Sequence, residues 1–127
     1  MNQRRRNNID IKVIPHNKQR YDTLGDYYFT KKGKLKVRVS DCNNQWYERM
    51  IIIHELIEET LTRYKGITEE EIMKFDLEHI DNEDPGSLNE SPYHDEHMIA
   101  LGIEQTLCLY MGIDWNIYDK RITKNNL

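Results

Sequence analysis

The hydrophobic pattern of this chain changes its period near Asn44, and that change constrains the fold more than any other feature. Residues 9–14 and 34–39 alternate apolar with polar side chains, which is typical of half-buried β-strands, and residues 27–29 add a third apolar segment. After Asn44 the apolar residues recur every three or four positions, as they do on the buried face of an α-helix. The sequence therefore predicts an α+β fold, in which a small antiparallel or mixed N-terminal β-sheet of about three strands packs on about three α-helices.

Capping residues mark the ends of the predicted helices. Gly66 follows the first helical stripe as a C-cap residue does, and Thr68 with Glu71 matches the capping box that opens a helix. Ser91 before Pro92 predicts the start of a third helix. The predicted helices cover about residues 44–66, 68–80 and 91–112, and a polar loop occupies residues 81–90. We expect one domain, residues 1–127, whose ends at 1–8 and 119–127 fray.

The first predicted helix carries His54 and Glu58 in and beside an apolar run, residues 50–57. At about 100° per residue, these two side chains lie one turn apart on the same face, while Glu55 projects from the side of the helix. The pattern is that of the HExxH metalloproteases with the last histidine replaced by glutamate. We therefore predict that His54 and Glu58 are metal ligands and that Glu55 is a catalytic general base.

The third predicted helix has a second stripe in which polar residues interrupt apolar ones. Its members are Tyr93, His97, Ala100, Glu104, Leu107 and Met111. If the first and third helices pack side by side, His97 and Glu104 meet His54 and Glu58 in the core, where a divalent cation removes the cost of burying the carboxylates. These nitrogen and oxygen ligands suit zinc best, and manganese, iron or nickel are compatible. The predicted metal ligands are thus His54, Glu58, His97 and Glu104, and the predicted cofactor is zinc or another divalent transition metal.

Other polar residues near these stripes have simpler interpretations. His94 lies about 60° from the ligand stripe, so we expect an exposed residue of the first turn, although a ligand role near the helix start stays open. We expect Glu96 to be solvated or paired with a basic residue, His79 to complement the end of the second helix, and His16 to lie in a surface loop. A role for Asp76 as a hydrogen-bond acceptor behind the site also stays open.

The charge distribution and the cysteines exclude several classes of protein. Residues 1–40 hold eleven Lys/Arg and three Asp/Glu, whereas residues 41–127 hold seven and nineteen. The basic side chains alternate along the predicted strands as solvent-facing positions do, and no nucleic-acid-binding module is recognisable, so we do not expect a nucleic-acid partner. We find no signal peptide, no membrane span and no metal-knuckle spacing at Cys42 or Cys108. We expect a cytoplasmic protein with reduced cysteines.

Over nearly the whole chain, the order of short motifs resembles a set of short uncharacterised proteins of phages and bacteria. The motifs are Ile14-Pro15-His16, Gln19-Arg20-Tyr21-Asp22-Thr23-Leu24-Gly25-Asp26, Val37-Arg38-Val39-Ser40, Trp46-Tyr47-Glu48, His54-Glu55-Leu56-Ile57-Glu58, Gly66-Ile67, Phe75-Asp76, Pro92-Tyr93-His94-Asp95-Glu96-His97 and Gly112-Ile113-Asp114-Trp115. That set has no assigned activity, so the resemblance implies kinship, and it favours His97 over His94 as a ligand.

A strand that leads into a helix bearing His-Glu, with a further ligand on a later helix, is also similar to a reduced zincin core. Glu58 departs from the zincin pattern, because it stands where the second histidine would be. A carboxylate ligand gives the metal more negative charge and makes a metal-bound water less acidic.

A second resemblance competes with the first. Glu55-x-x-Glu58 followed by Glu78-x-x-Asp81 matches the spacing of the MazG-type all-α nucleotide pyrophosphohydrolases, whose paired acids hold magnesium against phosphates. The predicted N-terminal strands argue against this resemblance, because these pyrophosphohydrolases are all-α proteins. His54 also argues against it, because magnesium sites do not use histidine at such a position.

Two functions follow from the predicted site. In the first, the protein is a metal-dependent hydrolase or peptidase, Glu55 is the base, and the strand that bears Arg38 is the edge on which an extended peptide docks. In the second, the protein is a non-enzymatic, phage-type accessory protein with a structural metal, which binds and masks a host protein. An open coordination position distinguishes a catalytic ion from a structural one.

Overall fold

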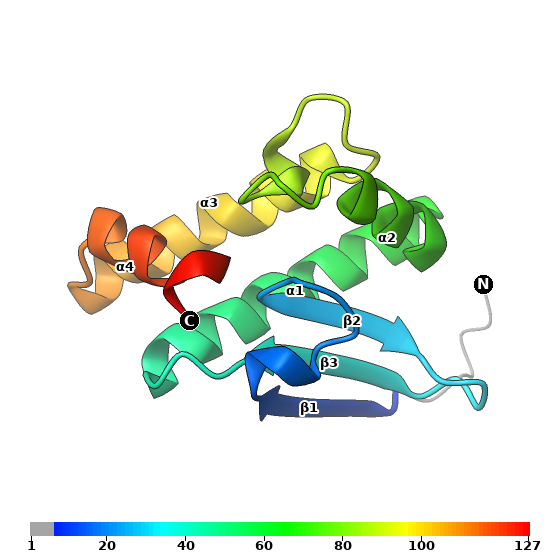
Figure 1. Cartoon of the computed structure of the whole chain (residues 1–127), viewed down its shortest axis with the longest axis horizontal. Helices are drawn as coiled ribbons and strands as arrows, with labels where there is room; N and C mark the ends of the chain where they lie inside the picture. Colours follow the sequence, from blue (N-terminus) through cyan, green and yellow to red (C-terminus); the bar gives the residue numbers. More distant parts are fainter. Residues whose placement is uncertain (1–6) are drawn as a thin grey trace.

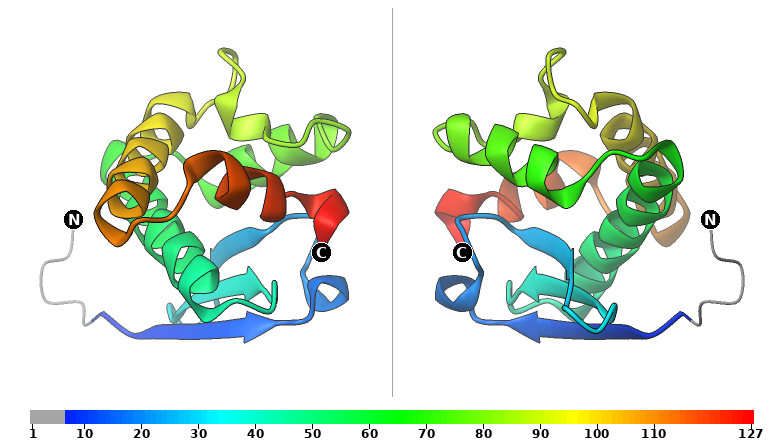
Figure 2. Two further views of the ribbon diagram at one scale, coloured as in Figure 1. Left: turned by 90° about the vertical axis from the view of Figure 1, so that its left-hand side faces the viewer. Right: turned by 90° about the vertical axis from the view of Figure 1, so that its right-hand side faces the viewer.

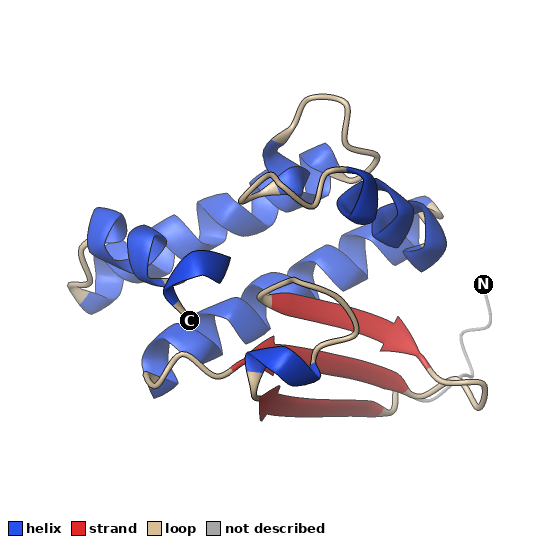
Figure 3. Cartoon of the chain, viewed as in Figure 1, coloured by secondary structure: helices blue, strands red, loops and turns tan. Residues whose placement is uncertain are grey.

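The computed structural model describes residues 7–127 and has the α+β architecture that the sequence predicts (Figure 1). Its strands are β1 (Ile9–Ile14), β2 (Gly25–Phe29) and β3 (Leu35–Ser40). Its α-helices are α1 (Gln45–Lys65), α2 (Glu69–Glu78), α3 (His94–Met111) and α4 (Trp115–Arg121), and short 3-10 turns occupy His16–Lys18, Pro85–Ser87 and Lys124–Asn126. The strands therefore lie in the N-terminal part of the sequence, and the α-helices lie in the C-terminal part (Figure 3). Residues 1–6 of the predicted N-terminal tail lie outside the described residues.

Helix α1 is the central element, because one of its faces packs on the sheet and another packs on α3 (Figures 1 and 2). On the sheet side, Ile51 joins a core with Tyr27, Leu35, Val37 and Val39. Burying each aliphatic side chain of this kind stabilises the fold by about 1.5–3 kcal/mol. The sheet thus fixes the position of α1 through apolar contacts and through the bond of 2.9 Å between the hydroxyls of Tyr27 and Thr62.

The sheet has the strand order β1-β3-β2 and is mixed, since β1 runs parallel to β3 and β2 runs antiparallel to it. The strand that bears Arg38 is therefore the central one, and the prediction that it forms a docking edge is wrong. Both sides of β3 already carry ladder hydrogen bonds. Arg38 itself donates to the backbone oxygen of Asp10 at 2.8 Å and to the Asp10 carboxylate at 3.2 Å, so it ties β1 to β3.

The predicted helix boundaries at Gly66 and Thr68 are confirmed, and Asn44 caps the start of α1. Asn44 Oδ1 accepts from the backbone N–H groups of Trp46 and Tyr47 at 3.0 and 3.1 Å, and Gly66 ends α1 in the left-handed conformation with φ 77°. The capping box at Thr68 opens α2.

Three boundaries differ from the sequence prediction. Helix α2 ends at Glu78, two residues early, and α3 begins at His94, because residues 91–93 form a turn in which Ser91 Oγ accepts the Tyr93 N–H at 3.2 Å. Residues 119–127 were expected to fray, but in the structure they end α4 and continue into a 3-10 turn. The described part of the chain contains no helix that is long and apolar enough to cross a membrane.

The segment after α4 is bound to two distant parts of the chain. The guanidinium of Arg121 donates to the backbone oxygen of Cys42, at the entry to α1. Lys124 Nζ donates to the backbone oxygens of Ile80 and Asn82 at 3.0 and 3.1 Å, in the loop between α2 and α3. These bonds hold that loop over the region where α1 and α3 meet.

Candidate metal centre

Three side chains that could ligate a metal ion converge between α1 and α3. They are His54, Glu58 and His97, and one ligand atom from each lies within 4.8 Å of the others. His54 Nε2 is 2.5 Å from Glu58 Oε2 and 3.2 Å from His97 Nδ1, and His97 Nδ1 also contacts Glu58 Oε2. All three side chains are buried, with 4–7% of their surface exposed. The structure therefore brings three of the four predicted ligands within reach of one ion, and the fourth, Glu104, contacts His54.

The positions of these side chains follow from helix geometry. His54 and Glu58 are one turn apart on α1, so they present their side chains to the same neighbour. His97 lies in the first turns of α3, which packs along that face. Beneath His97, Gly86 gives the ring room, because a Cβ at position 86 would lie 2.7 Å from the ring and 2.8 Å from Tyr93.

Each histidine is held by a carboxylate at its outer ring nitrogen. His54 Nδ1 contacts Glu104 Oε1, and His97 Nε2 lies 3.0–3.1 Å from the two oxygens of Asp84. The Tyr118 hydroxyl on α4 donates to the other oxygen of Glu104 at 2.6 Å. The structure thus places Glu104 behind His54, away from the point where the inner atoms of His54, Glu58 and His97 meet. In the sequence prediction Glu104 was a ligand.

Because carboxylates face both nitrogens of each ring, the histidines titrate far from their ordinary range. Burial lowers the pKa of His54, but Glu58 and Glu104 outweigh it and raise the pKa well above its usual value. For His97, burial is outweighed by Asp84 and Glu58, and the pKa rises to about 10. Burial raises the pKa of Glu58, yet the two histidines lower it to about 2. Two imidazolium rings thus compensate the buried acids when protons are the only cations present.

Glu55 is buried beside this cluster but directs its carboxylate elsewhere. A Cβ at Gly25 would lie 2.8 Å from Glu55 Oε2, so a larger residue at this position of β2 would force the Glu55 side chain to move. Burial and the charge of Glu58 raise the pKa of Glu55 well above its usual value. Within residues 7–127 the Glu55 carboxylate accepts no hydrogen bond, which leaves its oxygens available to a bound molecule.

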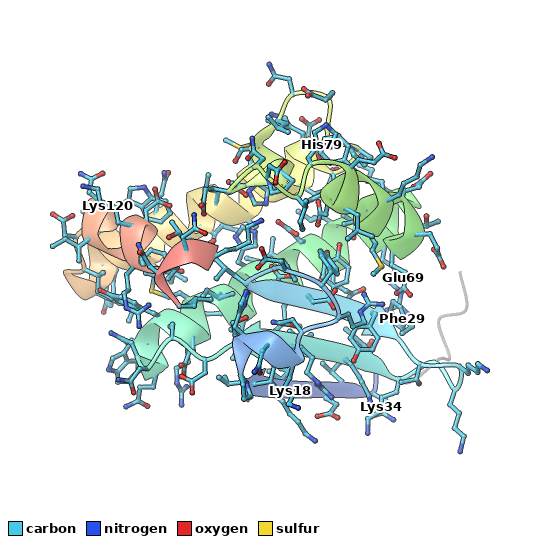
Figure 4. The ribbon with its side chains drawn as sticks, in the orientation of Figure 1. Lys18, Phe29, Lys34, Glu69, His79 and Lys120 are labelled. Carbon is cyan, nitrogen blue, oxygen red and sulfur yellow. The ribbon has the colours of Figure 1, made fainter. Side chains whose placement is uncertain are left out.

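A cavity of about 300 Å³ connects these groups to β2 and α2. Its lining includes His54, Glu55, Glu58 and His97, and also Gly25 and Tyr27 of β2, Ile72 of α2, and Ile122 to Lys124 after α4. At the far end of β2 the Phe29 N–H donates to Glu69 at 3.0 Å, and the two residues lie next to each other in Figure 4. The cluster is therefore the inner wall of a cleft between β2 and the helical layer.

The structure also settles where the other polar candidates lie. Asp76 accepts from the hydroxyls of Tyr21 and Tyr93 at 2.9 and 2.7 Å, and the Tyr93 ring packs edge-on against His97. Asp76 also lines the same cavity as the cluster. His94 contacts the backbone oxygen of Gly86 at 3.2 Å. None of the three ligand atoms of the cluster bonds to Asp76 or His94.

Glu96, His16 and His79 lie away from the cluster. Glu96 is buried, whereas the sequence predicted a solvated or paired residue. His16 bonds to Ser40 and Asp22, and the ring of His79 stacks on Phe75 at the end of α2. Glu78 and Asp81, which the pyrophosphohydrolase resemblance required, are exposed and do not line the cavity.

Sequence reasoning missed Asp84 and Tyr118. Asp84 lies in the polar loop that was predicted, but nothing in a loop sequence says which helix its carboxylate reaches. A signal existed in Asp84-Pro85-Gly86, because a proline and glycine beside an acid fix a tight turn and allow close approach. Tyr118 lies in α4, which was not predicted, because the last predicted helix ended at Gly112.

Comparisons with protein-family models, with curated proteins and with solved structures found no match to this chain.

Proposed function

We propose that the protein binds one divalent transition metal ion, best fitted by zinc, through His54 Nε2, Glu58 and His97 Nδ1. The observation that carries this proposal is the arrangement of the two imidazoles, each with its outer nitrogen on a carboxylate and its inner nitrogen facing Glu58. Histidine ligands in metalloproteins are oriented in this way by an outer carboxylate. Two nitrogens bound to a tetrahedral zinc ion lie about 3.3 Å apart, which matches the 3.2 Å between His54 Nε2 and His97 Nδ1.

The set proposed here differs from the sequence prediction in the place of Glu104. Glu104 and Asp84 become the supports of His54 and His97, so the ion has three protein ligands. Three ligands of this kind are typical of catalytic zinc sites, which keep one position open for water or substrate, whereas structural sites close with four.

The chemistry that fits these residues is hydrolysis of an amide bond. A bound ion of this type polarises a carbonyl group and makes a water molecule more acidic. Glu55 lies outside the ligand set, lines the same cavity and has a raised pKa, so it is the group placed to take a proton from water and pass it to the leaving amine. The resemblance to a reduced zincin core supports the same assignment.

The substrate that fits the cleft is an extended polypeptide. The backbone of Leu24 bonds to Ser40 of β3, so the alternate residues Gly25 and Tyr27 direct their peptide groups away from β3. Both residues line the cavity. A peptide in extended form pairs with such an edge, and here it would lie beside Glu55 and the ligands.

The proposal is tested by elemental analysis of protein purified without a histidine tag. We expect close to one equivalent of zinc or a similar ion. His97→Ala removes a ligand and should abolish binding, whereas the matched variant His94→Ala, on the same helix but outside the cluster, should keep the ion. Protein that holds no transition metal after reconstitution with zinc would contradict the proposal.

A second candidate function is a non-enzymatic factor in which the same ion is structural and the protein masks a partner. Exposed apolar side chains favour it, since Leu109, Tyr110 and Ile117 are 84%, 92% and 63% exposed where α3 and α4 meet. The resemblance to phage and bacterial proteins supports it too. A fourth protein ligand in a metal-bound structure would favour this function over hydrolysis.

A further inference from the structure

The outer edge of β1 combines an open backbone with an uncovered apolar row. β1 ends the strand order, so its outer side has no partner strand within residues 7–127. The backbone oxygens of Asn8 and Ile14 accept from β3, at 2.9 and 2.7 Å from Leu35 N and Asp41 N. Even-numbered residues of β1 thus bond to β3, and Ile9, Ile11 and Val13 direct their N–H and C=O groups outward.

The side chains of the same three residues extend the buried face of the sheet beyond the helices. Ile9, Ile11 and Val13 pair in register with Leu35, Val37 and Val39, and paired residues share a face. The β3 residues are 0–3% exposed beneath α1, whereas the β1 residues are 41–44% exposed. An edge strand with exposed apolar side chains and free peptide groups invites pairing with another strand.

We propose that two copies of the chain pair through β1, antiparallel about a twofold axis at Ile11, and so form a continuous six-stranded sheet. This register places Ile11 opposite Ile11 of the second copy and Ile9 opposite Val13, so that outward-facing peptide groups meet outward-facing ones. It also places Asp10 opposite Lys12 at two equivalent positions on the other face of the sheet.

The charged residues of β1 favour this register over the two registers that are shifted by two residues. A shift of the pairing by two residues in one direction places Asp10 opposite Asp10, and the same shift in the other direction places Lys12 opposite Lys12. Like charges in directly opposed positions are destabilising, and opposite charges are stabilising. Both shifts also reduce the number of paired residues. The segment Ile9-Asp10-Ile11-Lys12-Val13 is therefore complementary to a second copy of itself.

The dimer leaves the proposed metal centre open, because the cavity is lined by β2 at the opposite edge of the sheet. A failure of the dimer and a failure of the metal proposal are therefore separate results.

The register can be read with single cysteines. Opposed residues of a hydrogen-bonded antiparallel pair have Cα atoms about 5.5 Å apart, which lies within the range of a disulfide. Ile11→Cys should form a disulfide dimer under mild oxidation. The matched variant Ile9→Cys should not, because in this register its copies lie on the order of 13 Å apart. The native Cys42 and Cys108 are buried, so they add little background.

Charge reversal provides the second test, with sedimentation equilibrium as the measurement. Lys12→Asp creates two Asp–Asp pairs between the copies and should weaken the dimer roughly tenfold. The matched variant Lys18→Asp makes the same change of charge at an exposed position outside β1 and should leave the dimer unchanged. A wild-type protein that sediments as a monomer at high concentration, equal cross-linking of the two cysteine variants, or equal weakening by the two charge variants would overturn the proposal.

Discussion

The two sides of α1 bury very different chemistry. Toward the sheet, Ile51 packs against Val37 and Val39 in an apolar core, and Glu55 approaches Gly25 of β2 beside it. Toward α3, His54 and Glu58 meet other titratable groups that are just as well buried. The first region is stable because water is excluded from apolar surface, and it needs no particular partner atoms. The second is stable only when every buried charge is matched, by protons or by a metal ion.

The apolar contacts with the sheet therefore contribute mainly to the stability of the fold, whereas the titratable groups that face α3 define the candidate metal site. Changes on the sheet side should alter the free energy of unfolding and leave metal affinity alone. Changes on the α3 side should alter metal binding first.

The largest effect is expected for His54→Ala, which affects both properties. It removes a ligand and leaves Glu58 and Glu104 without their shared partner, and breaking a buried pair in this way costs about 3–5 kcal/mol. We expect loss of the metal and a much lower melting temperature, measured by thermal denaturation with and without a chelator. Ile53→Ala, at an exposed neighbouring position, is the control. A melt equal to that of the parent, with metal still bound, would show that His54 is not a ligand.

Ile51→Ala should lower the free energy of unfolding by about 2–4 kcal/mol, because it leaves a cavity beneath the sheet. Metal affinity of the folded protein should stay within about twofold, since Ile51 lines the cavity but supplies no ligand atom. Urea denaturation and a competitive zinc titration measure the two quantities. A large loss of affinity at this position would mean that the two sides of α1 are not independent.

Asp84→Asn should weaken metal binding by about 10–100-fold and change stability little. The amide keeps the shape of the loop but no longer presents a charged acceptor to His97 Nε2. Asp81→Asn, the same change at an exposed position outside the cavity, is the matched control in the same titration. Equal affinities of the two variants would show that Asp84 does not support His97.

Asp76 should make stability depend on pH in the opposite sense to an ordinary surface acid. Burial raises its pKa to about 6, although the bonds from Tyr93 and Tyr21 oppose that rise. Between the unfolded value and about pH 6 the folded state holds a proton that the unfolded state has lost. Stability therefore falls as pH rises through this window, by on the order of 2 kcal/mol. Asp76→Asn should remove that dependence when unfolding is measured from pH 4 to 7, and an unchanged profile would exclude the assignment.

Glu55→Gln should have the smallest effect on fold and metal, and it tests the catalytic role directly. The amide fits beneath Gly25 but cannot accept a proton, so hydrolysis of a quenched fluorescent casein should be lost while metal content is unchanged. If the parent also fails to cleave, and the variant behaves like it in every assay, the ion is structural.

The sequence predicted best those features that depend on neighbouring residues. Asn44, Gly66 and Thr68 fix helix ends through contacts within one turn, and the spacing of His54 and Glu58 follows from the helix alone. His97 was found because a polar residue interrupted an apolar stripe. A stripe defines a face, but it does not say which ring nitrogen a carboxylate meets, so the contact of Glu104 with the outer nitrogen of His54 could not be predicted.

The features that sequence reasoning missed depend on contacts between distant segments. The order β1-β3-β2 places the strand of Arg38 in the centre, and nothing in the alternation of residues 34–39 distinguishes a central strand from an edge. Asp84 reaches His97 from a loop, and Tyr118 reaches Glu104 from α4. Both bonds join segments whose relative placement is set only after the helices pack.

The bonds made by α4 and by the segment after it also mean that the candidate site is completed late during translation. As the chain leaves the ribosome, His54 and Glu58 emerge first, and Asp84 and His97 follow. Tyr118 and Lys124, which secure Glu104 and the loop of Asp84, appear only later. A nascent chain that stops before them has the proposed ligands but lacks the groups that orient the imidazoles. We therefore expect tight binding of the proposed ion only after α4 has been translated.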